Sequence, residues 1–114
     1  MRYAAGIDVG STYTKAVVVD QDHVIRGRAV MPTGFQLAEA AERALHEAIR
    51  GAGLQTAEVA YGVATGFGRH QVQFVDLKVT DLTAAARGAS ALFPGTRTIL
   101  DVGGQTMKAS RIDD

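Results

Sequence analysis

One short pattern that could bind phosphate occurs twice in the sequence. The segment from Asp8 to Asp20 aligns without gaps with the segment from Asp101 to Asp113, and 6 of the 13 positions are identical. In each copy an apolar run ends in a carboxylate, and a turn of small residues follows before a second strand-like run. Such a hairpin can present backbone N–H groups to an anion at its tip. Two such tips that face each other could hold the phosphates of a nucleotide, with a metal ion between the two carboxylates.

The first tip supplies three kinds of chemical group. Gly10 lets the backbone approach an anion closely, and the N–H and hydroxyl groups of Ser11 and Thr12 are hydrogen-bond donors. Asp8 can hold magnesium, either directly or through the waters of the ion. The alternative is that these residues form only a hairpin turn, which is the better interpretation of one copy taken alone.

The second tip makes phosphate binding the better interpretation, because it repeats the same order of a carboxylate followed by a turn of small residues. Asp101 matches Asp8 as a magnesium ligand, and glycine occupies two positions of the turn, Gly103 and Gly104. Gln105 adds an uncharged donor that could orient a phosphate or a water molecule. The repetition favours a phosphate clamp over two unrelated turns.

Other polar residues carry weaker signals. Lys15 and Lys108 follow the tips, and each is equally compatible with phosphate binding and with pairing to a surface carboxylate. Arg69 could contact phosphate or a partner protein, although a solvated arginine in a glycine loop is the simpler interpretation. The three histidines are scattered without a second ligand at metal spacing, and the sequence contains neither a P-loop nor a Rossmann fingerprint.

Composition narrows the class of protein. The 114 residues carry 12 basic and 12 acidic side chains, so the net charge is zero, and the sequence has no basic run. Both observations argue against nonspecific binding to nucleic acid. No apolar stretch approaches the roughly 18–20 residues of a membrane span. The absence of cysteine excludes disulfides and thiolate metal sites. No signal peptide is visible, so we expect a cytoplasmic protein without a membrane partner.

The elements that must position the tips follow from hydrophobic periodicity and turn residues. Thr80 is expected to cap the second helix, because its hydroxyl can accept a hydrogen bond from the first turn. The expected elements are strands at 3–9, 13–20 and 23–31, a helix at 36–50, a strand at 59–65 buried on both faces, a further strand at 72–79, a helix from 81 to about 92, and a strand at 97–102. This order predicts an α/β fold of the ribonuclease-H-like type. It combines a mixed sheet that contains a β-meander, flanking helices and a C-terminal β-hairpin.

Three stretches resemble the BadF/BadG/BcrA/BcrD-type ATPases of the actin, sugar-kinase and heat-shock-chaperone ATPase superfamily. These are Gly6–Thr12, Ala64–Arg69 and Asp101–Gln105. Members of that family activate 2-hydroxyacyl-CoA dehydratases or form the ATPase subunits of benzoyl-CoA reductases. The resemblance implies two ribonuclease-H-like domains with ATP or ADP and Mg²⁺ between them. It also implies paired subunits that share one [4Fe–4S] cluster, and a dehydratase or reductase component as partner.

The resemblance also assigns residues to roles. Asp8, Gly10, Ser11 and Thr12 would form the first phosphate loop, and Asp101, Gly103, Gly104 and Gln105 the second. Asp8, Asp101 and Gln105 are the candidate catalytic residues, and Lys15 is a candidate phosphate ligand. Residues 1–96 would be the first domain, and 97–114 the first hairpin of a second domain.

The sequence departs from the family pattern at three points. Ala84 stands where the family has the cysteine ligand of the cluster, so we expect no Fe–S cluster. Thr106 replaces an acidic residue that usually follows the second loop. The chain is also about half as long as family members, so its enzymatic activity is uncertain and we expect little ATP hydrolysis from it alone. The alternatives are a non-catalytic module that forms a homodimer through residues 97–114, and a sugar kinase, which is disfavoured because no sugar-binding region is identifiable.

Overall fold

The computed structural model describes residues 1–102 and 107–111 and divides into two compact units, Met1–Lys78 and Val79–Asp114. Each unit is described by itself. The division follows Lys78, whereas the expected boundary after residue 96 remains a prediction about domain organisation. Among the described residues no helix combines the length and apolar character needed to cross a membrane.

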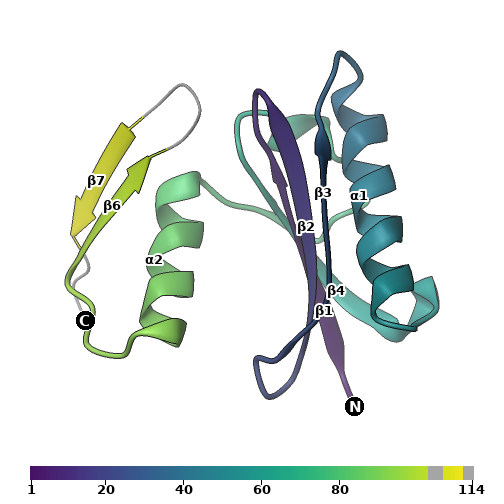
Figure 1. The fold of residues 1–114 in the computed structure, drawn as a ribbon, viewed down its shortest axis with the longest axis horizontal. Helices are drawn as coiled ribbons and strands as arrows, with labels where there is room; N and C mark the ends of the chain where they lie inside the picture. The colour runs from purple at the N-terminus through teal and green to yellow at the C-terminus, as the bar shows by residue number, and fades with distance from the viewer. Residues whose placement is uncertain (103–106, 112–114) are drawn as a thin grey trace. The chain divides into compact units, whose positions relative to one another are not determined.

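The first unit is a five-stranded mixed sheet with one long helix (Figure 1). The strands lie in the order β3-β2-β1-β4-β5; β1, β2 and β3 form an antiparallel meander, whereas β4 pairs in parallel with β1. The elements are β1 (Tyr3–Val9), β2 (Tyr13–Asp20), β3 (Ile25–Pro32), α1 (Leu37–Gly51), β4 (Val59–Thr65) and β5 (Leu77–Lys78), with short 3-10 turns at Thr56–Glu58 and Arg69–Gln71. The expected mixed sheet with a meander is confirmed.

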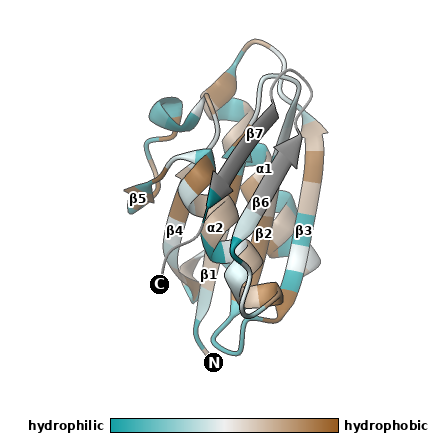
Figure 2. Ribbon diagram, turned by 90° about the vertical axis from the view of Figure 1, so that its left-hand side faces the viewer, coloured by the Kyte–Doolittle hydropathy of each residue, from teal (hydrophilic) through white to brown (hydrophobic). Residues whose placement is uncertain are grey.

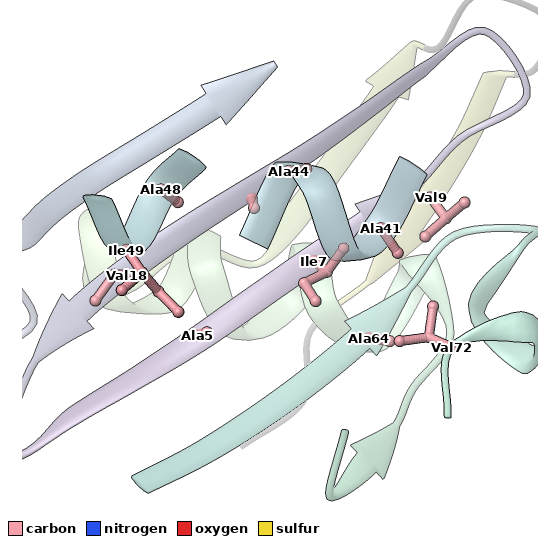
Figure 3. Packing of buried hydrophobic residues seen from close by; sticks show 11 residues of the cluster. Ala5, Ile7, Val9, Val18, Ala41, Ala44, Ala48, Ile49, Ala64 and Val72 are labelled. Atoms are coloured by element: carbon pink, nitrogen blue, oxygen red, sulfur yellow. The ribbon is translucent and has the colours of Figure 1, made fainter. Parts of the chain in front are cut away.

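The core of the first unit lies between this sheet and the apolar face of α1 (Figure 3). Strand residues at every second position point toward the helix, and the helix contributes mainly alanine, so that the two layers can approach closely. Gly27 marks the tightest approach, because a Cβ there would overlap the Ala48 carbonyl of α1. The fully or almost fully buried members are Ala5, Ile7, Val9, Ala16, Val18, Ala41, Ala44, Ala48, Ile49, Ala64 and Val72.

The turn between β2 and β3 is organised by one buried carboxylate. Asp20 accepts hydrogen bonds from the N–H groups of Asp22 (2.8 Å) and Val24 (3.1 Å), and its other oxygen accepts from Arg26 Nε at 2.7 Å. His23 takes a left-handed conformation with φ of 64° inside this turn. Strand β3 therefore begins at Ile25, two residues later than the sequence predicted. Hydrophilic and hydrophobic segments alternate along this edge strand (Figure 2).

Strand β4 has a sparsely covered edge. The expected strand at 72–79 is reduced to Leu77–Lys78, because Val72 instead ends a 3-10 turn and is buried in the core. Before that strand, Asp76 contacts β4 with both its backbone and its side chain: its N–H donates to the Gly62 carbonyl at 2.9 Å, and its carboxylate accepts from the Gly62 N–H at 2.7 Å. The expectation that β4 is buried on both faces is wrong, since Tyr61 is 46% exposed.

The second unit contains α2 (Asp81–Leu92) and the antiparallel strands β6 (Thr98–Val102) and β7 (Met107–Arg111). Thr80 caps α2 as expected, with its hydroxyl accepting from the Thr83 N–H at 3.3 Å. Helix α2 contacts both strands of the hairpin. Within the described chain, β6 and β7 form a sheet of two strands only.

Candidate functional site

The first tip joins β1 to β2 at the end of the central strand of the sheet. Gly10 donates its N–H to the Tyr13 carbonyl at 3.0 Å, which closes the turn around Ser11 and Thr12. Both of these residues are exposed. Within the described part of the chain neither of their N–H groups donates a hydrogen bond, so both are available to an anion.

Asp8 and Lys15 lie side by side next to this tip. The antiparallel register pairs the two residues directly across β1 and β2, on the face of the sheet opposite α1. Lys15 is exposed and Asp8 is half-buried. The tip therefore combines two N–H donors, a carboxylate and an ammonium group, which are the groups needed to hold magnesium and phosphate.

A second loop, Thr65–Arg69, lies against the base of the tip. It begins at the last residue of β4, whose parallel register places Thr65 beside Asp8, and the Gly68 N–H donates to the Val9 carbonyl at 3.1 Å. Gly66 has φ of 91°, and a Cβ on it would lie 2.6 Å from Asp8 Oδ1. Glycine is therefore required here, because it lets the loop backbone reach the carboxylate. The structure brings together two of the three stretches that carry the family resemblance.

Arg69 has a local structural contact. It is half-buried, and its guanidinium donates to the Gly66 carbonyl at 2.9 Å, as does its own N–H at 3.1 Å. The side chain thus folds over the loop that packs on Asp8. It is not the solvated side chain that the simpler interpretation of the sequence favoured.

The sequence analysis missed Thr33, a buried residue that holds the backbone of the tip through hydrogen bonds. Thr33, in the connection between β3 and α1, is 4% exposed and donates its hydroxyl to the Gly10 carbonyl at 2.8 Å. Its N–H donates to the Thr12 carbonyl at 2.9 Å. The Thr14 hydroxyl, also buried, lies 2.8 Å from the Thr33 hydroxyl. The only signal in the sequence for this contact is that Thr14 lies near the start of β2 and Thr33 directly follows β3, its antiparallel partner.

The repeat in the sequence is also a repeat in backbone pairing. Asp101 pairs across the hairpin with Lys108, as Asp8 pairs with Lys15. The flanking pairs correspond in the same way, with Leu100 opposite Ala109 and Val102 opposite Met107. Two hairpins of equal register thus carry the two tips. Gly103, Gly104 and Gln105 lie outside the described residues.

The residues of this chain are compatible with a magnesium ion at Asp8 but not with an iron–sulfur cluster. In the part of the chain that the structure describes, no three acidic or histidine side chains gather as a metal site. A magnesium ion at Asp8 would therefore take its other ligands from phosphate oxygens and water, as this ion commonly does. An iron–sulfur cluster does not fit, because clusters are held mainly by thiolates and the sequence has no cysteine. Ala84 lies in the first turn and a half of α2, where the resemblance places a cysteine.

Comparison with known proteins supplies the family. A model described as the BadF/BadG/BcrA/BcrD ATPase family matches residues 5–114. The activator of lactoyl-CoA dehydratase from Anaerotignum propionicum is 38% identical over 98% of this chain. The (R)-2-hydroxyglutaryl-CoA dehydratase activating ATPase from Acidaminococcus fermentans is 30% identical, also over 98% of the chain. The chain spans 43% of the length of each of these relatives.

Solved structures agree with the sequence relatives. Component A of the Acidaminococcus fermentans (R)-2-hydroxyglutaryl-CoA dehydratase matches with a TM-score of 0.92 and 29% identity, over 100% of this chain and 44% of that one. The activator of 2-hydroxyisocaproyl-CoA dehydratase from Clostridium difficile, solved with bound ADPNP, gives 0.86 and 32%, over 97% of this chain and 41% of that one. A ROK hexokinase from Thermus thermophilus, at 0.66 and 22%, shares the fold.

Proposed function

Because this chain belongs to the BadF/BadG/BcrA/BcrD ATPase family, we propose that it binds the phosphates of ATP or ADP through the tip Gly10–Thr12. The observation that carries the proposal is the pair of N–H groups at Ser11 and Thr12. Both residues are exposed, and neither N–H group donates a hydrogen bond within the described residues. Gly10 would let the backbone approach the phosphate closely, and Lys15 would contribute positive charge beside it.

Magnesium is the second part of the proposal. Asp8 would hold the ion, directly or through water, on the side of the tip that faces away from α1. When bound, magnesium neutralises phosphate charge and fixes the orientation of the phosphate oxygens. At the second tip, Asp101 is the proposed magnesium ligand, and Gly103, Gly104 and Gln105 are the proposed phosphate-binding residues. The match to a relative solved with ADPNP supports this assignment.

The activity of the whole protein is proposed from its relatives. Two of them are a dehydratase activator and a dehydratase-activating ATPase, so we infer that this chain supplies the phosphate-binding part of such an ATPase, with a dehydratase or reductase component as partner. Phosphoryl transfer is accelerated by preorganised charges in a water-poor site. A chain that spans 43% of its relatives is therefore expected to turn over well below about 1 s⁻¹ by itself.

A structural module that forms a homodimer is the second candidate. Among the described residues β6 and β7 form a two-stranded sheet without a third strand, and such a hairpin is only marginally stable alone. Its edges can pair with the same segment of a second chain. This candidate requires no nucleotide, so binding measurements separate it from the first.

Titration calorimetry with ATP, AMP and pyrophosphate, each with and without magnesium, tests the proposed function. We expect ATP and pyrophosphate to bind in a magnesium-dependent manner and AMP to bind weakly. Asp8→Asn should remove most of the magnesium dependence. Asp22→Asn is the matched control, because this carboxylate is exposed in the turn between β2 and β3. Tight AMP binding without any gain from pyrophosphate would contradict the proposal.

A further inference from the structure

We propose that Thr33 is a positioning residue that aims the Ser11 N–H at phosphate, an inference that rests on the proposed function of the tip. Thr33 lies 22 positions after Ser11 in the sequence and is buried, so it would act through the backbone of the tip. Its role follows from the direction of three hydrogen bonds and from the geometry of the peptide group.

The direction of the hydrogen bonds is fixed by the chemistry of the hydroxyl group. The Gly10 carbonyl can only accept, so the single hydroxyl hydrogen of Thr33 is used in that 2.8 Å contact. In the 2.8 Å contact between the two threonines, Thr14 must therefore be the donor. The result is a directed chain from the Thr14 hydroxyl to the Thr33 hydroxyl to the Gly10 carbonyl, in which each bond strengthens the next.

The end of this chain determines where Ser11 points. The Gly10 carbonyl and the Ser11 N–H belong to one planar trans peptide group, and in such a group the C=O and N–H bonds point in opposite directions. Because Thr33 holds the carbonyl toward the buried side, the Ser11 N–H must point to the exposed side. The hydrogen bond also polarises the peptide group, which makes this N–H a stronger donor.

A second bond from the same residue holds the other end of the tip. The Thr33 N–H donates to the Thr12 carbonyl, so Thr33 binds the backbone before and after Ser11. Gly10 by itself would leave this three-residue turn with wide conformational freedom. Donors that are already oriented lose less entropy on binding, so a fixed tip binds phosphate more tightly than a mobile one.

The first experiment uses the ligand-free chain. Thr33→Val keeps the shape of the side chain and removes the hydroxyl, and we expect it to shift the NMR signals of the Gly10 carbonyl carbon and of the Ser11 amide. Thr33→Ser should restore both signals. Val18→Ala, a core change toward the opposite end of β2, is the control for loss of stability and should leave them in place. An unchanged Gly10 carbonyl signal in Thr33→Val would overturn the inference.

The second experiment measures binding of magnesium pyrophosphate at a temperature where every variant is folded. Thr33→Val should raise the Kd about three- to tenfold, as expected for the loss of one oriented hydrogen bond, and Thr33→Ser should stay within about twofold of the wild type. Equal weakening by Val18→Ala would show a merely structural role and overturn the inference.

Failure of the proposed function gives a different result. If the wild-type chain does not bind pyrophosphate, then the proposed function is wrong, and the Ser11 N–H that Thr33 orients does not serve phosphate binding. If the wild type binds and Thr33→Val binds equally well, then the positioning role alone is wrong.

Discussion

Replacing Gly66 with alanine should destabilise the first unit by about 2–5 kcal/mol. Two costs add. The left-handed conformation at φ of 91° costs a residue with a Cβ about 1–2 kcal/mol. The new methyl group would overlap the Val9 carbonyl and lie 2.6 Å from Asp8 Oδ1, and overpacking of this kind costs about 1–3 kcal/mol.

Two other glycines separate these costs. Gly34 also has a positive φ, of 67°, but a Cβ there would meet nothing within 4 Å. Gly34→Ala should therefore cost only the conformational part, about 1–2 kcal/mol. Gly51, at the end of α1, has neither a positive φ nor a neighbour within 4 Å, and Gly51→Ala should be neutral or stabilising by up to about 1 kcal/mol.

Urea unfolding followed by the NMR signals of β1 and β2 measures the free energy for the first unit alone. The midpoints should fall in the order Gly51→Ala, Gly34→Ala, Gly66→Ala, from high to low. The same Gly66→Ala protein, where folded, should lose magnesium-dependent pyrophosphate binding because its Cβ displaces the Asp8 carboxylate. If Gly66→Ala is no less stable than Gly34→Ala, then the loop moves away without cost and the close approach to Asp8 is not a constraint.

Three further predictions concern stability and assembly. Burial raises the pKa of Asp20, but hydrogen bonds from Val24, Arg26 and Asp22 bring that pKa below its usual range. A carboxylate with a lowered pKa in the folded state contributes stability at a pH above its unfolded pKa, and this contribution is lost as the pH falls. Asp20→Asn should therefore reduce the stability of the first unit at pH 7, and the difference from the wild type should close below about pH 4. A constant gap from pH 7 to pH 3 in thermal unfolding would contradict this. Thr80→Ala should destabilise α2 by about 1 kcal/mol through loss of its cap, measured by amide exchange, with Thr80→Ser retaining protection. Deleting residues 104–114 should convert the proposed homodimer to a monomer in light scattering while the circular dichroism of the first unit persists, and a monomeric intact chain would refute the dimer.

Local sequence signals predicted most of the fold because its elements have strong local boundaries. Strand β4 runs from Val59 to Thr65 as expected, since Gly66 ends it, and Thr80 caps α2 as expected. The errors arise where a tertiary contact replaces a local preference. Strand β3 starts late because the Asp20 carboxylate takes the N–H groups of the turn, and the strand expected at 72–79 shrinks because Val72 is drawn into the core.

The candidate site could be predicted only in part for the same reason. Asp8 and the tip could be proposed from the sequence because their residue types and order suit magnesium and phosphate binding, and the repeat supports that proposal. The contribution of Thr33 depends on hydrogen bonds across 23 positions to Gly10, which no local pattern specifies. The proximity of Gly66 to Asp8 likewise depends on the parallel pairing of β1 with β4.

The double contact of Asp76 with Gly62 bears on how the protein behaves at high concentration. An exposed strand edge is a template for strands of other molecules and a common origin of fibrils. At Gly62 both the N–H and the carbonyl are already occupied by Asp76, so an incoming strand would have to break two hydrogen bonds and displace a negative charge. The carboxylate should therefore oppose aggregation along β4, where β5 pairs only with Val63 and Ala64 among the described residues.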